Sequence, residues 1–347
     1  MDKFLIPFLI TLSFSLIFSW VVIFLGKKIK YLGRNEKRHF HKKKIVRIGG
    51  LAIVLSFNAG ILFDKNLVLT PEIFGFLFAS WIILAMGLWD DVKEIFWKFQ
   101  LFFQIVAALS IFIAGIRMNF ITNFFTGGTI SLESEIGVVV SVFLVIFWIV
   151  LMINVMNWLD GIDGLSSNVA LISAGTILFL SLKPEVNQPP VAIMSAVLAG
   201  AILGFLILNF YPAKIIAGTA GSNFLGFSLA VLAIFSGTKI ATAILVMIVP
   251  LVDFLWVIMD RARRKKSIFQ PDKNHLHFKL MELGWSPIKI NGLFVLVTLV
   301  AAFLALNTRT IGKLLTIILS GLLVALFLLF IEYKLKNARK IKKISIG

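Results

Sequence analysis

The chain contains no cysteine. Disulfide bonds, thiolate metal sites and cysteine nucleophiles are therefore excluded, and the redox state of its compartment leaves no signature. Charged residues are also few. They make up 15% of the 347 residues, and only 17 residues are Asp or Glu. With so few acidic groups, each cluster of them is a candidate for acid–base or metal chemistry.

Apolar residues fill most of the chain instead. They account for 59% of the residues, and the mean hydropathy is +0.98. A soluble core cannot hide that much apolar surface, so most of it must face lipid. The first apolar run, 4–25, has full spanning length and precedes basic residues, which is typical of a membrane helix rather than of a cleaved signal peptide. We therefore expect an all-α polytopic membrane protein.

Apolar runs of about 17 to 25 residues predict about eleven transmembrane helices in a single integral membrane domain, 1–347. Several of the runs are short or interrupted by glycine. The predicted spans are 4–25, 48–63, 73–89, 99–116, 136–153, 167–182, 191–208, 223–236, 240–259, 288–306 and 311–331.

The distribution of Lys and Arg predicts the orientation. If the loop 27–47 is cytoplasmic, only seven of the 34 basic residues fall outside, namely Lys3, Lys65, Arg117, Lys183, Lys239, Arg309 and Lys313. This is the asymmetry of the positive-inside rule, so we expect the N-terminus outside and the C-terminus inside. The predicted cytoplasmic segments are 27–47, 90–98, 154–166, 209–222 and 260–287, with a basic tail at 332–347.

The net charge of +17 follows from the same topology. Basic cytoplasmic loops produce such a charge without nucleic acid, so we expect no nucleic-acid partner. The basic tail is predicted to rest on anionic lipid headgroups.

Four polar residues follow one apolar run at intervals of three. Asn154, Asn157, Asp160 and Asp163 would form a ribbon along one side of a helix. Polar and ionisable groups at the mouth of a lipid-buried helix are costly, which indicates a function. Gly161 would let the backbone approach a ligand closely. A polar helix cap is the alternative, but a cap requires only one such residue.

Asp90 and Asp91 close another predicted span on the same face. Adjacent carboxylates repel each other unless they share a cation or a proton, so the pair indicates a Mg²⁺ site or a shared proton. A solvated helix end is the alternative. A transporter would more often place such groups near the bilayer midplane. Asp253, which follows Pro250, is the one carboxylate that could lie deeper, on a kinked helix.

His275 and His277 lie in the predicted loop 260–287, close to Lys273. A His-x-His pair can bind zinc, but no thiolate is available as a further ligand. Imidazoles beside a lysine instead favour phosphate binding, on the face that carries the Asp residues.

Several motifs recur in a fixed order along the chain. They are the Arg-x-Gly-Gly motif that ends at Gly50, the Asp90-Asp91 pair, Asn-x-x-Asn-x-x-Asp-Gly-Ile-Asp-Gly from Asn154, Asn-x-Tyr-Pro-Ala from Asn209, Ala220-Gly-Ser222, and Pro-Asp-x-x-His-Leu-His from Pro271. In order and spacing they resemble the motifs of the polyprenyl-phosphate N-acetylhexosamine-1-phosphate transferases. The His-Leu-His form and the helix count look more like the GlcNAc-1-phosphate branch than like the phospho-MurNAc-pentapeptide transferases.

The resemblance implies transfer of a sugar 1-phosphate from a UDP-N-acetylhexosamine to undecaprenyl phosphate, giving undecaprenyl-diphospho-sugar and UMP. It implies Mg²⁺ as the cofactor, with Mn²⁺ as the alternative. Such an enzyme would work in the bacterial cytoplasmic (inner) membrane with its active site on the cytoplasmic face, at the first membrane step of a cell-envelope glycan pathway such as lipopolysaccharide or teichoic acid synthesis. Its partners would be the two substrates and the lipid bilayer, and a homodimer is left open.

The resemblance also implies roles for individual residues. The candidate catalytic residues are Asp90, Asp91, Asp160, Asp163, His275 and His277. The candidate substrate-binding residues are Arg47, Asn154, Asn157, Gly161, Asn209, Ser222 and Lys273. The expected metal ligands are Asp90, Asp91 and Asn157.

The chain departs from the family pattern at the metal site. Thr219 stands where the family has a metal-binding Asp, and Ile216 stands where it has a base-stacking aromatic residue. A neutral hydroxyl is a poor substitute for a carboxylate ligand of a hard cation. We favour a metal held by the remaining oxygen ligands. A catalytically impaired homologue that still binds polyprenyl phosphate or nucleotide, and a membrane transporter, are the alternatives, and the sequence does not choose the sugar.

Overall fold

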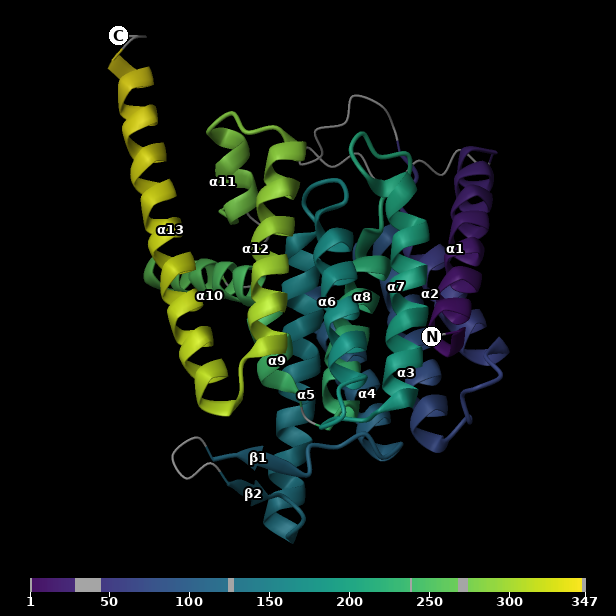
Figure 1. Cartoon of the computed structure of the whole chain (residues 1–347). Helices are drawn as coiled ribbons and strands as arrows, with labels where there is room; N and C mark the ends of the chain where they lie inside the picture. Colours follow the sequence, from purple (N-terminus) through teal and green to yellow (C-terminus); the bar gives the residue numbers. More distant parts are fainter. Residues whose placement is uncertain (1, 29–44, 124–127, 238, 268–273, 345–347) are drawn as a thin grey trace.

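The computed structural model describes residues 2–28, 45–123, 128–237, 239–267 and 274–344. Over these ranges the chain is a bundle of α-helices with one small antiparallel hairpin (Figure 1). The helices are α1 (Asp2–Lys28), α2 (Gly50–Phe63), α3 (Pro71–Val92), α4 (Trp97–Ile113), α5 (Glu135–Leu159), α6 (Leu165–Ser181), α7 (Pro189–Asn209), α8 (Gly218–Phe235), α9 (Ile240–Val246), α10 (Ile248–Arg263), α11 (Leu276–Glu282), α12 (Pro287–Asn307) and α13 (Thr310–Ile344). The strands are β1 (Phe120–Thr122) and β2 (Thr129–Ser131).

Seven of the described helices are long and apolar enough to cross a membrane, or eight if the bent pair α9–α10 counts as one span. Three shorter apolar helices, α2, α4 and α6, accompany them. The chain is thus a multi-pass, predominantly helical membrane protein. Each predicted span overlaps one of these helices or the bent pair, while the count of eleven crossings and the orientation stay predictions.

Local sequence signals explain where several helices begin. The Ser134 hydroxyl accepts a hydrogen bond from the Gly137 amide at 3.1 Å and so caps α5. Pro71, Pro189 and Pro287 each occupy the first position of a helix, α3, α7 and α12. A proline is tolerated there because the amide it lacks would have had no partner within the helix.

The predicted span 240–259 is not one helix. α9 ends at Val246, α10 begins at Ile248, and the two are bent by 79°, so that α10 lies across the direction of its neighbours (Figure 1). Pro250 explains the break, because its ring would collide with the carbonyl of Val246 and it has no amide hydrogen to donate.

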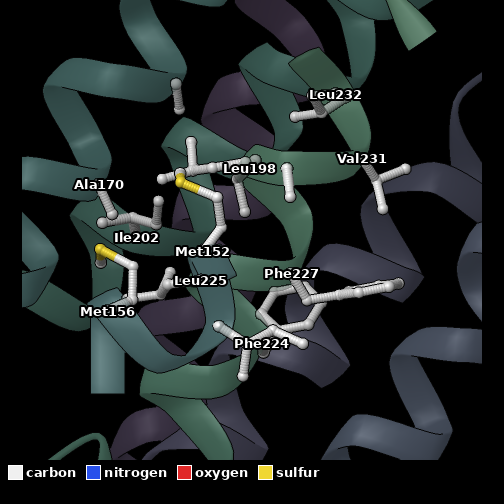
Figure 2. Packing of buried hydrophobic residues seen from close by; sticks show 14 of the residues in the cluster. Met152, Met156, Ala170, Leu198, Ile202, Phe224, Leu225, Phe227, Val231 and Leu232 are labelled. Atoms are coloured by element: carbon white, nitrogen blue, oxygen red, sulfur yellow. The ribbon is translucent and has the colours of Figure 1, made fainter. Parts of the chain in front are cut away.

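The core lies where α5, α6, α7 and α8 meet. Side chains from these four helices, among them Met152, Ala170, Ile202 and Leu225, fill the centre of the bundle (Figure 2). Almost every residue of α8 is buried, whereas α13 exposes a long row of apolar side chains. An exposed apolar helix of this kind is expected to face lipid. The rigid centre of the molecule is therefore α8, whose first turn carries Thr219.

Two predicted boundaries differ from the structure. α5 ends at Leu159, so Asp160 and Asp163 lie in a turn rather than on a helical ribbon. Gly164 explains the turn, because its φ of +73° is a left-handed conformation that glycine adopts without strain. The predicted tail, 332–347, is helical as far as Ile344 and continues α13.

Candidate active site

The segment before α2 is fastened to the loop before α8. Val46 and Ile215 form a parallel bridge, and the Gly50 amide donates to the Ala217 carbonyl at 2.8 Å. A Cβ atom on Gly50 would lie 2.1 Å from the backbone nitrogen of Gly221, so only glycine allows the two helix starts to approach this closely. This contact explains the Gly-Gly of the predicted motif.

Asp91 caps α8 from the neighbouring helix α3. Its Oδ1 accepts from the Thr219 amide at 2.8 Å, and its Oδ2 accepts from the Ala220 amide at 3.1 Å. The Arg47 Nε lies 3.7 Å from Oδ1, and the Asp91 side chain is completely buried. A carboxylate suits a helix N-terminus, since it satisfies amides that lack a partner and complements the helix dipole. Asp91 therefore fixes the first turn of α8.

Asp90 gathers donors from three places. Its Oδ1 accepts from the Gln100 side chain at 2.9 Å and from the Ile95 amide at 3.1 Å. Its Oδ2 accepts from the Thr219 hydroxyl at 2.7 Å. The position where the sequence lacks the expected carboxylate thus lies directly against the acidic pair.

Asp160 follows the last residue of α5 and is half-buried. Its Oδ1 accepts a hydrogen bond from the Ser166 hydroxyl at 2.5 Å. Burial raises the pKa of Asp160 to about 7, while that hydrogen bond and the Arg47 charge oppose the rise and the Asp163 charge adds to it. Because Arg47 acts on both Asp91 and Asp160, the two acidic clusters belong to one site.

The turn that carries Asp163 is tied to the loop after α7. Asp163 Oδ2 accepts from the Ala213 amide at 3.0 Å. The Asn209 side chain accepts from the Gly164 amide at 3.1 Å and donates to the Ile215 carbonyl at 2.9 Å. Asn209 therefore positions the turn, and its direct contact with substrate stays a prediction.

Three further predicted residues have partners within the bundle. Asn154 donates to the side chain of Gln104 on α4 at 2.9 Å. Asn157 donates to the side chain of Asn223 on α8 at 2.7 Å. The Ser222 hydroxyl donates to a carbonyl of its own helix, four residues earlier. Asn157 thus reaches the first turns of α8, whereas Asn154 leans toward α4, and the contacts of all three with substrate stay predictions.

Asp253 on α10 holds the histidine segment. Its Oδ2 lies 2.9 Å from His275 Nδ1, and its Oδ1 accepts from the Leu276 amide at 2.8 Å. Asp253 thereby caps α11 and orients the His275 ring. The sequence indicated this carboxylate only as the mark of a kinked helix. The structure shows that it positions the histidine segment. The sequence signal for such a role is an acidic residue in an otherwise apolar stretch, shortly after Pro250.

His277 is completely buried, and neither of its ring nitrogens has a hydrogen-bond partner in the described part of the chain. Its ring is parallel to that of His275 at 5.7 Å, and a Cβ atom on Gly161 would lie 2.2 Å from its Nε2. Burial lowers the pKa of His277 to about 3; His275 adds to the shift and Asp253 opposes it. A neutral imidazole without a partner among the described residues thus lies beside the Asp160 turn, and such a buried polar group calls for a further hydrogen-bonding group.

Comparisons with known proteins show the family to which the chain belongs. The family model described as Glycosyl transferase family 4 matches residues 73–237. Phospho-N-acetylmuramoyl-pentapeptide-transferase of Limosilactobacillus reuteri is 32% identical over 320 residues, which cover 87% of this chain and 94% of that protein. Decaprenyl-phosphate N-acetylglucosaminephosphotransferase of Mycobacterium leprae is 30% identical over 317 residues, which cover 82% of this chain and 78% of that protein. The chain belongs to this family of polyprenyl-phosphate sugar-1-phosphate transferases.

A Bacillus subtilis relative covers more of the chain. It is described as a probable undecaprenyl-phosphate N-acetylglucosaminyl 1-phosphate transferase and is 29% identical over 338 residues, 96% of this chain and 91% of that protein. Among the predicted site residues, the structure brings Arg47, Asp90 and Asp91 to the first turn of α8. It ties Asp163 to the loop before α8 and places His277 against Gly161. Lys273 lies outside the described residues.

The family resemblance implies a magnesium ion. The oxygen atoms near Asp90 and Asp91 show whether the site fits one. In the described ranges, no three His, Asp or Glu side chains are grouped as metal ligands. Asp91 is buried with both oxygens on helix amides, whereas the one described donor to Asp90 Oδ2 is the Thr219 hydroxyl. Mg²⁺ usually takes one or two carboxylates together with waters and substrate phosphates. The residues fit an ion held by Asp90 and the substrate, while Asp91 and Asn157 as ligands stay predictions.

Proposed function

We propose that this protein transfers GlcNAc 1-phosphate from UDP-GlcNAc to undecaprenyl phosphate. An oxygen of the lipid phosphate bonds to the phosphorus that carries the sugar, and the bond from that phosphorus to the UMP oxygen breaks. The products are undecaprenyl-diphospho-GlcNAc and UMP. The observation that carries the proposal is the meeting of two acidic clusters around Arg47 at one end of an apolar helical bundle. The family relatives give no support to a transporter.

The main role of the protein's side chains would be to position the two phosphate-bearing substrates and to neutralise their negative charge. Phosphoryl transfer between anionic groups depends on placing them in line and on neutralising the developing charge. Arg47 would neutralise the donor diphosphate, and a magnesium ion held by Asp90 would supply further positive charge. Neutral His277 would donate a hydrogen bond from its ring N–H to a phosphate oxygen. Asp160, Gly161 and Asp163 would contact uridine and ribose, as the family resemblance implies.

The position of the site suits two substrates of different solubility. It lies at helix ends, where a lipid phosphate at the membrane boundary and a water-soluble nucleotide can meet. We infer that the site faces the cytoplasm from the bacterial inner membrane. The basic loops 27–47 and 260–287 are predicted on the same side of the membrane as the site, and basic loops are typical of the cytoplasmic side. A homodimer stays a prediction, which the mass of the detergent-solubilised protein would test.

The test is an incubation of the purified full chain with undecaprenyl phosphate, Mg²⁺ and one UDP-sugar at a time, with the lipid products identified by mass spectrometry. A lipid diphospho-GlcNAc formed from UDP-GlcNAc in preference to UDP-GalNAc supports the proposal. Preference for UDP-GalNAc would change the sugar but keep the reaction class. Binding of UMP without any lipid product would instead indicate a catalytically impaired homologue, for which Thr219 is the motivating observation.

A further inference from the structure

Three lysines meet at the end of the bundle opposite the acidic site. Lys183 follows α6, Lys239 precedes α9, and Lys313 lies near the start of α13. The Lys183 ammonium donates to the Leu306 carbonyl, and the Lys313 ammonium donates to the Thr242 hydroxyl at 2.7 Å. The charges of Lys183 and Lys239 both act on Lys313. We call these three residues the lysine cluster; α9 and the α12–α13 turn lie at the hairpin end of the bundle (Figure 1).

No carboxylate in the described part of the chain neutralises the lysine cluster. Within the described ranges, none of its members forms an ion pair. Glu185, two residues from Lys183, is exposed and pairs with none of them. Because all three lysines are half-buried, water screens their mutual repulsion less than it would on an open surface. The cluster therefore lacks a counter-ion among the residues that the structure describes.

Helix capping explains only one of the three lysines. Lys183 donates to a carbonyl in the last turn of α12, where a cation is favourable. Lys313 lies near the start of α13, where the helix dipole disfavours a cation. Lys239 makes no side-chain hydrogen bond to the described residues. Two of the lysines therefore call for an anion from elsewhere.

The location of the cluster also departs from the general charge distribution. Only seven of the 34 basic residues fall on the predicted outer side. Four of those seven lie at this end of the bundle, in the loop after α6, at the start of α9 and around the α12–α13 turn: Lys183, Lys239, Arg309 and Lys313. Positive residues on that side are otherwise sparse, so their gathering indicates a common ligand.

We propose that the lysine cluster binds the phosphate of an anionic phospholipid headgroup in the leaflet opposite the acidic site. Ammonium groups donate strong hydrogen bonds to phosphate oxygens. Apolar side chains next to the cluster are exposed, with Ile311 at 60%, Leu315 at 54% and Leu182 at 42%. This apolar surface would take the acyl chains of a lipid, whereas a free phosphate ion would gain nothing from it. The site is separate from the proposed catalytic one and does not depend on it.

The test measures binding of phosphatidylglycerol to the purified full chain in detergent by native mass spectrometry and by melting temperature, with phosphatidylcholine as the neutral lipid. Lys239→Gln with Lys313→Gln should weaken phosphatidylglycerol binding, by about fivefold for each lysine. Lys65→Gln is the matched control, because Lys65 is an exposed lysine on the same predicted side but outside the cluster. Lys239→Gln alone is the second variant, because its side chain makes no hydrogen bond that the fold requires.

The proposal predicts a larger melting-temperature rise with phosphatidylglycerol than with phosphatidylcholine in the wild type and in Lys65→Gln, and a smaller difference in both cluster variants. Equal effects of phosphatidylglycerol on all four proteins would overturn it. Inorganic phosphate is the other arm of the experiment. If phosphate alone reproduces the lipid effect in the wild type, the cluster is a site for free anions and the lipid assignment is wrong.

Discussion

The Thr219 hydroxyl donates a hydrogen bond to Oδ2 of Asp90 at 2.7 Å. The residue that departs from the family pattern is therefore in direct contact with the acidic pair, and its backbone amide is held by Asp91. A change at this position therefore acts directly on the acidic pair.

Thr219→Asp should increase the stabilisation that Mg²⁺ gives. In the absence of metal, a third carboxylate would repel Asp90 and Asp91. In the presence of Mg²⁺, it would add an anionic ligand to the ion. The melting temperature should fall in the absence of Mg²⁺ and rise more steeply with Mg²⁺ than in the wild type. Thr219→Ser, which keeps the hydroxyl, should behave like the wild type. The same Mg²⁺ midpoint in Thr219→Asp and wild type would separate this position from the metal.

Asp91→Asn should lower stability, whereas Asp90→Asn should mainly lower turnover. Asp91 caps the first turn of α8 with both oxygens, and loss of such a cap costs about 1 kcal/mol. Asp90 is partly exposed and is the oxygen ligand that the proposal assigns to the metal. Melting temperatures and turnover of the two variants, measured side by side, check this division. Equal destabilisation of both would contradict it.

Asp160 should make stability depend on pH. Burial raises the pKa of Asp160 from 3.8 to about 7 in the folded protein. Between about pH 4 and pH 7 the folded state holds this proton and the unfolded chain does not, so the free energy of unfolding falls as pH rises through that window and levels off above it. Asp160→Asn removes this contribution. The melting temperature of the wild type relative to the variant should therefore decrease from pH 4.5 to about pH 7, and a constant difference would count against the assignment.

Gly161→Ala should disrupt the contact with the histidine segment. A Cβ atom at this position would lie 2.2 Å from His277 Nε2 and 2.9 Å from Phe278. Displacement of α11 should reduce the melting-temperature rise that UMP gives to the wild type. Gly175→Ala is the matched control, because a Cβ atom there would have no atom within 4 Å apart from its chain neighbours and the backbone of its own helix. Full UMP protection in Gly161→Ala would show that this contact is not part of the nucleotide site.

Much of the helical arrangement could be predicted, because long apolar runs leave few other structures possible in lipid. Pro250 was visible in the sequence, yet the predicted span 240–259 ran through it. The turn at Asp160 was also missed. The spacing of three favoured a continued helix, whereas α5 ends at Leu159 and Gly164 completes the turn into α6. The acidic clusters were visible as residue types.

The residues that contact the acidic clusters and the histidines could not be predicted from the sequence. Thr219 and Asp90 are far apart in the chain, as are Asp253 and His275, and only the packing of α3, α8, α10 and α11 brings them together. The lysine cluster likewise comes from three separate places in the chain, namely the loop after α6, the start of α9 and the first turn of α13. No local pattern encodes such meetings, because they depend on tertiary contacts rather than on neighbours in sequence.

The central claim is that the sugar and its phosphate move together to the lipid. UDP-GlcNAc labelled with ³²P only at the phosphorus next to the sugar, incubated with the purified chain, undecaprenyl phosphate and Mg²⁺, tests it most directly. We predict that the label appears in the lipid product and that unlabelled UMP is released in equal amount. Label that stays in the nucleotide while sugar reaches the lipid, or no labelled lipid at all, would contradict the account.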